Sequence, residues 1–230
     1  MKAKVASRRP APAEVDEADL PEAWRRRPWV PVLIVAVLIA GVLGAGLAVE
    51  RSLAPQVPAP LAGCKSSVQI APHQFIGRQP ICINPSNTYV ATVNTTQGPI
   101  VIQLHPEIAP ATVNNFIVLA IHGYYDGLTF WKSEDWVVQG GDPRGDGRGG
   151  PGYNLLDEPS TMPWGLYAVG MARVPGGAVN GSQFFIEKAP WPDPGPTAVY
   201  NRFGTVISGM DKAQQLQAGE TIKSITIKVS

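Results

Sequence analysis

The side chains best suited to chemistry gather in two segments of this 230-residue chain. Phe130–Gly141 reads FWKSEDWVVQGG, and Asn180–Ile186 reads NGSQFFI. Together they supply aromatic rings, an ammonium group and two side-chain amides, whereas Ser182 has no histidine close in the motif to activate it as a nucleophile. Apolar walls, amides and a cation can still accelerate a reaction without a covalent step, if they bind its transition state more tightly than its ground state.

Alternating strands and two short helices are expected to position these segments. Tyr89–Val93 and Pro99–Leu104 alternate apolar and polar residues on either side of a turn, which is typical of a half-buried hairpin. Apolar residues recur at helical spacing from Pro110 to Ala120, and a second short helix is predicted at about Met210–Leu216. The last strand, Ile225–Val229, could pair with the first and close the sheet into a barrel.

The order of the motifs over residues 87–230 resembles that of the cyclophilins, which are peptidyl-prolyl cis–trans isomerases. The shared motifs are GYYDGLTF at Gly123–Phe130, QGGDP at Gln139–Pro143, NGSQFFI at Asn180–Ile186 and FGTVISGMD at Phe203–Asp211. The resemblance implies a mainly β domain of the compact bacterial type. It further implies a closed eight-stranded antiparallel barrel with two capping helices and a proline site on its outer wall.

A member of this family would catalyse rotation about X–Pro peptide bonds. The barrier is ~18–20 kcal/mol because rotation breaks amide resonance, and uncatalysed exchange is slow, on the order of tens to hundreds of seconds. The enzyme has only to hold the proline ring, grip the flanking backbone and favour the twisted amide over the planar one. No cofactor is therefore expected.

The resemblance also assigns roles to individual residues. Lys132 and Gln139 are the expected catalytic residues, the lysine as a cationic donor and the glutamine as the residue that orients it. The expected peptide-binding residues are Trp136, Val137, Ala172, Arg173, Gln183, Phe185, Trp191 and Tyr200. Of these, Trp136, Val137 and Phe185 would line the proline pocket.

Lys132 departs from the family, which usually has Phe-His-Arg where this chain has Phe130-Trp131-Lys132. Lysine keeps the charge but lacks the planar fork of arginine, so the exchange is not conservative where geometry counts. A hydrogen bond to a charged group is worth ~1.5–3 kcal/mol, and ~1.4 kcal/mol is tenfold in rate. We therefore expect activity reduced by roughly one to two powers of ten. The alternatives are a proline-peptide-binding module or holdase without turnover, and a structural anchor with a vestigial pocket.

The composition argues against two other functions. The formal net charge is +1, so the chain lacks the surplus of Lys and Arg that general nucleic-acid binding needs. The three histidines, His73, His105 and His122, are dispersed without metal-ligand spacing, so no metal site is predicted.

Residues 29–49, WVPVLIVAVLIAGVLGAGLAV, form an uncharged apolar run long enough for a membrane-spanning helix, which needs roughly 20 residues. Arg25–Arg27 precede it, which places the N-terminus in the cytoplasm and the rest of the chain outside. Residues 1–28 are predicted to be a disordered cytoplasmic tail. We expect a single-pass anchor in the cell membrane, and a cleaved signal peptide is the alternative.

Residues 50–86 are rich in proline and alanine in their first half, which is typical of an extended linker. They contain both cysteines, Cys64 and Cys82. An extracytoplasmic location permits a disulfide between them; free thiols, or lipidation of Cys64 after Leu61-Ala62-Gly63, are the alternatives. The expected partners of residues 87–230 are proline-containing peptides and unfolded exported proteins, with cyclosporin-like ligands as a further candidate from the resemblance.

Overall fold

The computed structural model describes residues 57–64, 66–173, 176–192 and 199–230, which fall in one compact unit, Pro55–Ser230. The predicted cytoplasmic tail and membrane-spanning run, residues 1–49, lie outside the described residues. Within the described ranges, no helix combines the length and apolarity needed to cross a bilayer.

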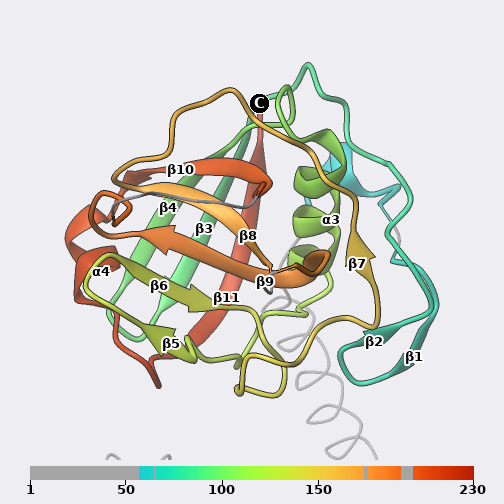
Figure 1. The fold of residues 1–230 in the computed structure, drawn as a ribbon. Helices are drawn as coiled ribbons and strands as arrows, with labels where there is room; N and C mark the ends of the chain where they lie inside the picture. The colour runs from blue at the N-terminus through green and yellow to red at the C-terminus, as the bar shows by residue number, and fades with distance from the viewer. Residues whose placement is uncertain (1–56, 65, 174–175, 193–198) are drawn as a thin grey trace, which may run out of the picture. The chain divides into compact units, whose positions relative to one another are not determined.

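A curled antiparallel sheet forms the body of the unit (Figure 1). Over the described residues it has nine strands in the order β11-β3-β4-β10-β8-β9-β6-β5, with β7 paired to β9. Its strands are β3 (Tyr89–Thr95), β4 (Pro99–Leu104), β5 (Lys132–Ser133), β6 (Val137–Gly140), β7 (Asn154–Leu155), β8 (Ala168–Arg173), β9 (Val179–Glu187), β10 (Arg202–Ser208) and β11 (Ile222–Val229). The mainly β, cyclophilin-like architecture expected from the sequence is therefore present.

The predicted closure of the barrel is wrong. The first and last strands do pair, since β3 and β11 form an antiparallel ladder, but the sheet then ends at β5 on its other side. The edge strand β5 has only two residues, too few to continue a ladder across to β11. The described part of the sheet is therefore a curled, open half-barrel.

Irregular backbone bonds span the open side of the sheet. Phe130 N donates to Glu220 O at 2.8 Å, and Ile222 N donates to Leu128 O at 2.8 Å. Gly127 has a φ of 82°, a left-handed conformation that interrupts an extended strand. The two segments thus approach each other and bond, but they cannot form a regular ladder.

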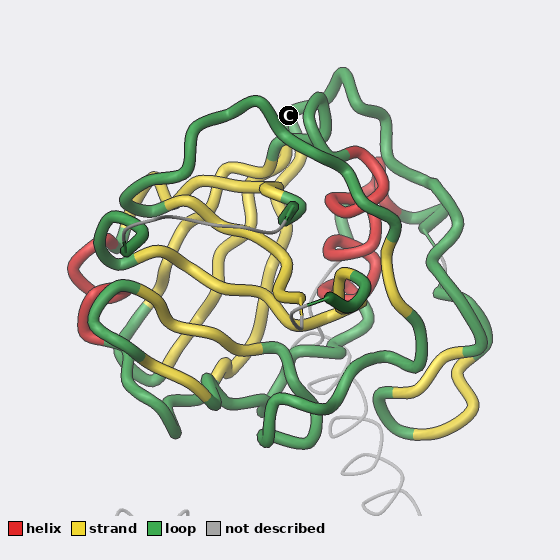
Figure 2. The backbone as a smooth tube through the Cα atoms, viewed as in Figure 1, coloured by secondary structure: helices red, strands yellow, loops and turns green. Residues whose placement is uncertain are grey.

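The two α-helices among the described residues lie at opposite ends of the curled sheet (Figures 1 and 2). They are α3 (Pro110–Ile121) and α4 (Met210–Gln215), close to the predicted ranges. Pro110 stands in the first turn of α3, where a missing backbone N–H costs least. The fully buried Phe116 of α3 packs edge-on against Phe184 of β9, with ring centroids 5.6 Å apart. Helix α3 thereby packs against the side of β9 that faces the main core.

The sheet presents different side chains on its two faces. Successive residues of a strand point to opposite faces, so Phe184 of β9 lies in the main core while Phe185 lies on the other face. Phe185 joins a second, smaller apolar cluster with Val137 and Ala172. This outer cluster lies where the sequence places its candidate site.

The described residues of the range 57–86 pack onto the sheet and α3. They contain the 3₁₀-helix η2 (Ala59–Leu61) and the two-stranded sheet of β1 (Gln69–Ala71) and β2 (Gln74–Phe75). Leu61, Phe75 and Ile83 are buried members of the main core. Cys64 and Cys82 form a disulfide, and Cys82 N donates to Asn114 Oδ1 on α3 at 2.8 Å.

Candidate active site on the outer face of the sheet

Strand pairing places the central candidate residues on one face of the sheet. Lys132 of β5 is the direct partner of Gln139 of β6, and Gln139 is in turn the partner of Phe185 of β9. Directly opposed residues of antiparallel strands project to the same side. The ammonium, the amide and the apolar ring therefore form one row across three strands, on the face away from the main core.

Five aromatic rings surround the end of this row, and we call them the aromatic niche: Trp136, Trp164, Phe185, Trp191 and Tyr200. All except Phe185, which is buried, are half-buried and pack against the small cluster of Val137, Ala172 and Phe185. The ring centroids of Trp136 and Trp191 are 4.6 Å apart, and those of Trp191 and Tyr200 are 5.4 Å apart. Such spacings are typical of packed aromatic pairs.

Trp164 is a member of the niche that the sequence analysis missed. It stacks on Phe185 at an interplanar angle of 28°, with centroids 5.5 Å apart. Gly170 of β8 makes room for this stack, because a Cβ there would come within 2.6 Å of Trp164 Cη2 and 2.7 Å of Phe185 Cζ. The only sequence signal for Trp164 is that it stands, with Gly165, just before the buried strand β8. Trp164 belongs to none of the family motifs quoted above.

Gln183 lies at the centre of a hydrogen-bond network beside the niche. Its Oε1 accepts from Gln139 Nε2 at 2.9 Å and from Trp131 Nε1 at 3.2 Å. Its Nε2 donates to the carbonyls of Gly147 and Gly149 at 3.1 and 2.7 Å. Because the buried amide of Gln183 is fully used inside the protein, it fixes its neighbours rather than reaching freely for a peptide.

Lys132 is ion-paired rather than isolated. Its Nζ lies 2.8 Å from Glu134 Oε1, and the two side chains are 39% and 44% exposed. Glu134 also accepts a hydrogen bond from Trp136 Nε1 at 2.8 Å. The hydrogen bond from Lys132 is the main reason that the pKa of Glu134 is lowered. Glu134 thus ties the ammonium to the rim of the aromatic niche.

Arg173, the remaining predicted residue, follows Ala172 on β8 and forms an ion pair with Asp157. The resemblance to the family predicts that Arg173 contacts the peptide backbone. Its guanidinium is engaged with the protein, so that contact would require the ion pair to be shared or broken.

A buried carboxyl group supports the segment that carries Trp164. Glu187 Oε2 accepts from Gly165 N at 2.7 Å, and Glu187 O accepts from Tyr167 N at 2.9 Å. Burial raises the pKa of Glu187 to about 7, although the backbone N–H of Gly165 and the charge of Arg202 act in the opposite direction. The position of Trp164 is therefore coupled to a group that titrates near neutrality.

The site offers binding and charge rather than covalent chemistry. The niche presents an apolar surface of aromatic rings in which Trp164 covers Phe185, and the row beside it carries an amide and an ammonium. A curled antiparallel sheet that carries an outer row of aromatic rings, an amide and an ammonium is the arrangement that the sequence motifs predict.

The comparisons with known proteins agree with the fold and the motifs. The family model "Cyclophilin type peptidyl-prolyl cis-trans isomerase/CLD" matches residues 90–229, and the chain belongs to this family. Peptidyl-prolyl cis-trans isomerase B of Bacillus subtilis is 40% identical over 128 residues, which cover 55% of this chain and 88% of that protein.

Solved structures give the same result. A cyclophilin-type peptidyl-prolyl cis-trans isomerase of Cryptosporidium parvum matches with a TM-score of 0.55 and 27% identity, covering 61% of this chain and 98% of that one. The same parasite protein, solved in the presence of the dipeptide Ala-Pro, matches with a TM-score of 0.54 and 27% identity, over 60% and 98% of the two chains.

Proposed function

We propose that this cyclophilin-type isomerase assists the folding of exported or cell-surface proteins by accelerating rotation about their X–Pro bonds. The observation that carries the proposal is the row of Lys132, Gln139 and Phe185 beside the aromatic niche. It brings an apolar floor, an amide and a cation within one short stretch of sheet, which are the three elements that twisting a prolyl amide requires.

In this mechanism the proline ring packs among the half-buried rings of the niche, next to Trp164, which stacks on Phe185. Gln139 Nε2 is bonded to Gln183, so its Oε1 is the atom that can accept a hydrogen bond from Lys132 or from the peptide. Lys132 donates to the prolyl nitrogen or its carbonyl as the amide twists. Since these contacts are stronger in the twisted state, they lower the barrier.

We further propose that Lys132 makes the isomerase slower than a relative with arginine in this position. A lysine ammonium is a compact charge without a planar fork, and here it is also drawn toward Glu134. Both features reduce its ability to follow the prolyl amide through the twist.

The proposed location is the outer side of the cell membrane, with residues 29–49 as the anchor. The support comes from the charge-free apolar run and the arginines before it. The Cys64–Cys82 disulfide fits this location, because such bonds persist in oxidising compartments and are rare in the cytosol.

The test is a protease-free isomerisation assay on an Ala-Pro peptide, with cis–trans exchange followed by NMR. The wild-type protein should accelerate exchange, and Lys132→Ala should lower the rate at least severalfold. Lys228→Gln, which removes an exposed positive charge on β11, is the matched control and should have no effect. A wild-type protein that leaves the exchange rate at its uncatalysed value refutes the proposal.

A proline-peptide-binding module without turnover is the second candidate, favoured by the ion pair between Lys132 and Glu134. If that pair holds the ammonium away from the prolyl bond, the niche still binds peptides while the rate stays unchanged. Titration of the protein with a proline-containing peptide, followed by the fluorescence of the niche tryptophans, separates the two candidates. It detects binding of the peptide whether or not the X–Pro bond is isomerised.

A further inference from the structure

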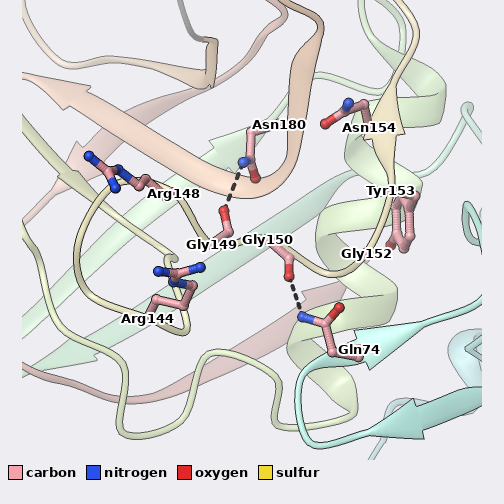
Figure 3. A pocket seen from close by; sticks show the side chains of 9 residues that line it. All are labelled: Gln74, Arg144, Arg148, Gly149, Gly150, Gly152, Tyr153, Asn154 and Asn180. Atoms are coloured by element: carbon pink, nitrogen blue, oxygen red, sulfur yellow. Dashed lines mark hydrogen bonds between the residues drawn. The ribbon is translucent and has the colours of Figure 1, made fainter.

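A polar groove of about 360 Å³ lies along the glycine-rich loop 144–152, outside the aromatic niche (Figure 3). Arg144 and Arg148 of this loop line it, together with Asn154 of β7, Asn180 of β9 and Gln74 of β2. Among the described residues, no Asp or Glu lines the groove. Its walls are thus rich in hydrogen-bond donors and carry positive charge.

The backbone of the loop is fixed from several sides. Gly149 O accepts from Asn180 Nδ2 at 3.0 Å, and Gly150 O accepts from Gln74 Nε2 at 2.9 Å, as the dashed lines in Figure 3 show. The buried carboxylate of Asp142 accepts from the backbone N–H of Arg144 at 2.8 Å. Because the arginine side chains start from a held backbone, less loop entropy has to be lost when they bind a ligand.

The two arginines differ in their partners. Arg144 Nη2 lies 2.9 Å from Asp146 Oδ2, in an exposed ion pair. Arg148, which is also exposed, has no ion-pair partner within the part of the chain that the structure describes. A guanidinium presents a planar set of donors that matches a carboxylate with two parallel hydrogen bonds. Arg148 is therefore the group with the most capacity to bind an anion.

Gln183 connects this groove to the aromatic niche. The same amide that accepts from Gln139 donates to the carbonyls of Gly147 and Gly149 in the loop. Along β9, Asn180 of the groove and Phe185 of the niche are separated by roughly 17 Å, at about 3.3 Å per residue. An extended peptide with its proline in the niche reaches the groove with a residue roughly four to six positions away.

We propose that the groove is a subsite for an acidic side chain of the peptide whose proline occupies the aromatic niche. The ligand class is a carboxylate, bound by Arg148 with Arg144 as the second positive charge. This inference rests on the proposed function, since it assigns a substrate preference to the same site. The protein would then favour clients that carry Asp or Glu a few residues from the proline.

The experiment compares Glu- and Gln-containing proline peptides, with the variable residue placed three to seven positions before or after the proline. Dissociation constants come from isothermal titration at low salt. In at least one position, Glu should bind more tightly than Gln by roughly two- to fivefold, the range for an exposed ion pair. High salt should remove the preference, because screening weakens exposed charge pairs.

Three variants assign the preference to the groove. Arg148→Gln should abolish it, Arg148→Glu should invert it toward a Lys-containing peptide, and the control Lys228→Gln on β11 should leave it intact. The inference is overturned if no position prefers Glu, or if the preference survives in the Arg144→Gln/Arg148→Gln double variant.

The isomerisation of the Gln-containing peptide separates this inference from the proposed function. Acceleration of that peptide without any Glu preference refutes the groove alone. Absence of acceleration refutes turnover, and the binding constants still decide whether the groove selects acidic peptides.

Discussion

Replacing Lys132 by arginine should restore a large part of the activity that the family's usual residue provides. Arginine would present a planar fork in the same row as Gln139 and Phe185. A hydrogen bond to a charged group is worth about 1.5–3 kcal/mol. At ~1.4 kcal/mol for each factor of ten, kcat/KM should rise by roughly one to two powers of ten.

Glu134 sets how much of this gain appears. Its ion pair with Lys132 is half-exposed, and exposed pairs are worth about 0.2–1 kcal/mol. Freeing the ammonium with Glu134→Gln should therefore raise kcat/KM by no more than about fivefold. The double variant Lys132→Arg/Glu134→Gln should exceed either single variant, because it supplies the fork and removes its competitor.

The assay is NMR exchange of an Ala-Pro peptide at several protein concentrations, with Lys132→Ala as the lower reference. Folding of each variant is checked by its thermal unfolding midpoint, which should stay near that of the wild type because both side chains are partly exposed. If Lys132→Arg, Lys132→Ala and Glu134→Gln all give the wild-type rate, position 132 has no catalytic part and the reasoning fails.

Three further predictions concern the niche, the buried carboxyl group and the disulfide. Trp164→Ala should raise KM about two- to tenfold with a smaller change in kcat, since an aromatic stack is worth ~0.5–1.5 kcal/mol; Trp164→Phe should retain most of the affinity, and a lower KM in Trp164→Ala would mean that Trp164 blocks the niche instead. The contribution of Glu187 to the free energy of unfolding should fall as pH rises from about 4.5 to 7, because the folded state keeps on Glu187 a proton that the unfolded state has released. The free energy of unfolding is measured with urea at pH 5 and pH 8. Glu187→Gln should reduce the loss of free energy of unfolding between these two pH values by up to about 3 kcal/mol, and an unchanged loss would contradict the raised pKa. Replacing both Cys64 and Cys82 by Ser should lower the free energy of unfolding by about 3 kcal/mol, since the bond closes a loop with a sequence separation of 18 residues. Equal urea midpoints for the variant and the wild type would show that the disulfide does not stabilise the fold.

Much of the fold follows from local sequence patterns. The hairpin of β3 and β4, helix α3 and the last strand lie where alternation and helical spacing predict them. The opposite directions of Phe184 and Phe185 also follow from the period of a strand. The open side of the sheet does not follow from local patterns. The strand is interrupted near Gly127, where residues 127–130 meet residues 220–222, which are distant in the sequence.

The candidate site could be predicted only in part. The motifs predict that Lys132, Gln139 and Phe185 belong together, and strand register places them in one row. Trp164 reaches Phe185 through a loop that no periodicity describes, and the pairing of Lys132 with Glu134 depends on rotamers. The burial of Leu61 and Phe75 could not be predicted either, because the sequence around them resembles that of an extended linker.

The docking of β2 has a practical consequence for work with this protein. Phe75 N donates to Pro151 O at 2.7 Å, so a segment far upstream braces the loop that carries Arg144 and Arg148. A shorter version that starts at Asn87, where the family's pattern begins, would lack the core residues Leu61, Phe75 and Ile83. The apolar surface that they cover on α3 and the sheet would then be exposed to solvent. A version that begins between residues 50 and 56 keeps these core residues and omits the proposed anchor, so it should stay in solution, whereas the version that begins at Asn87 should aggregate.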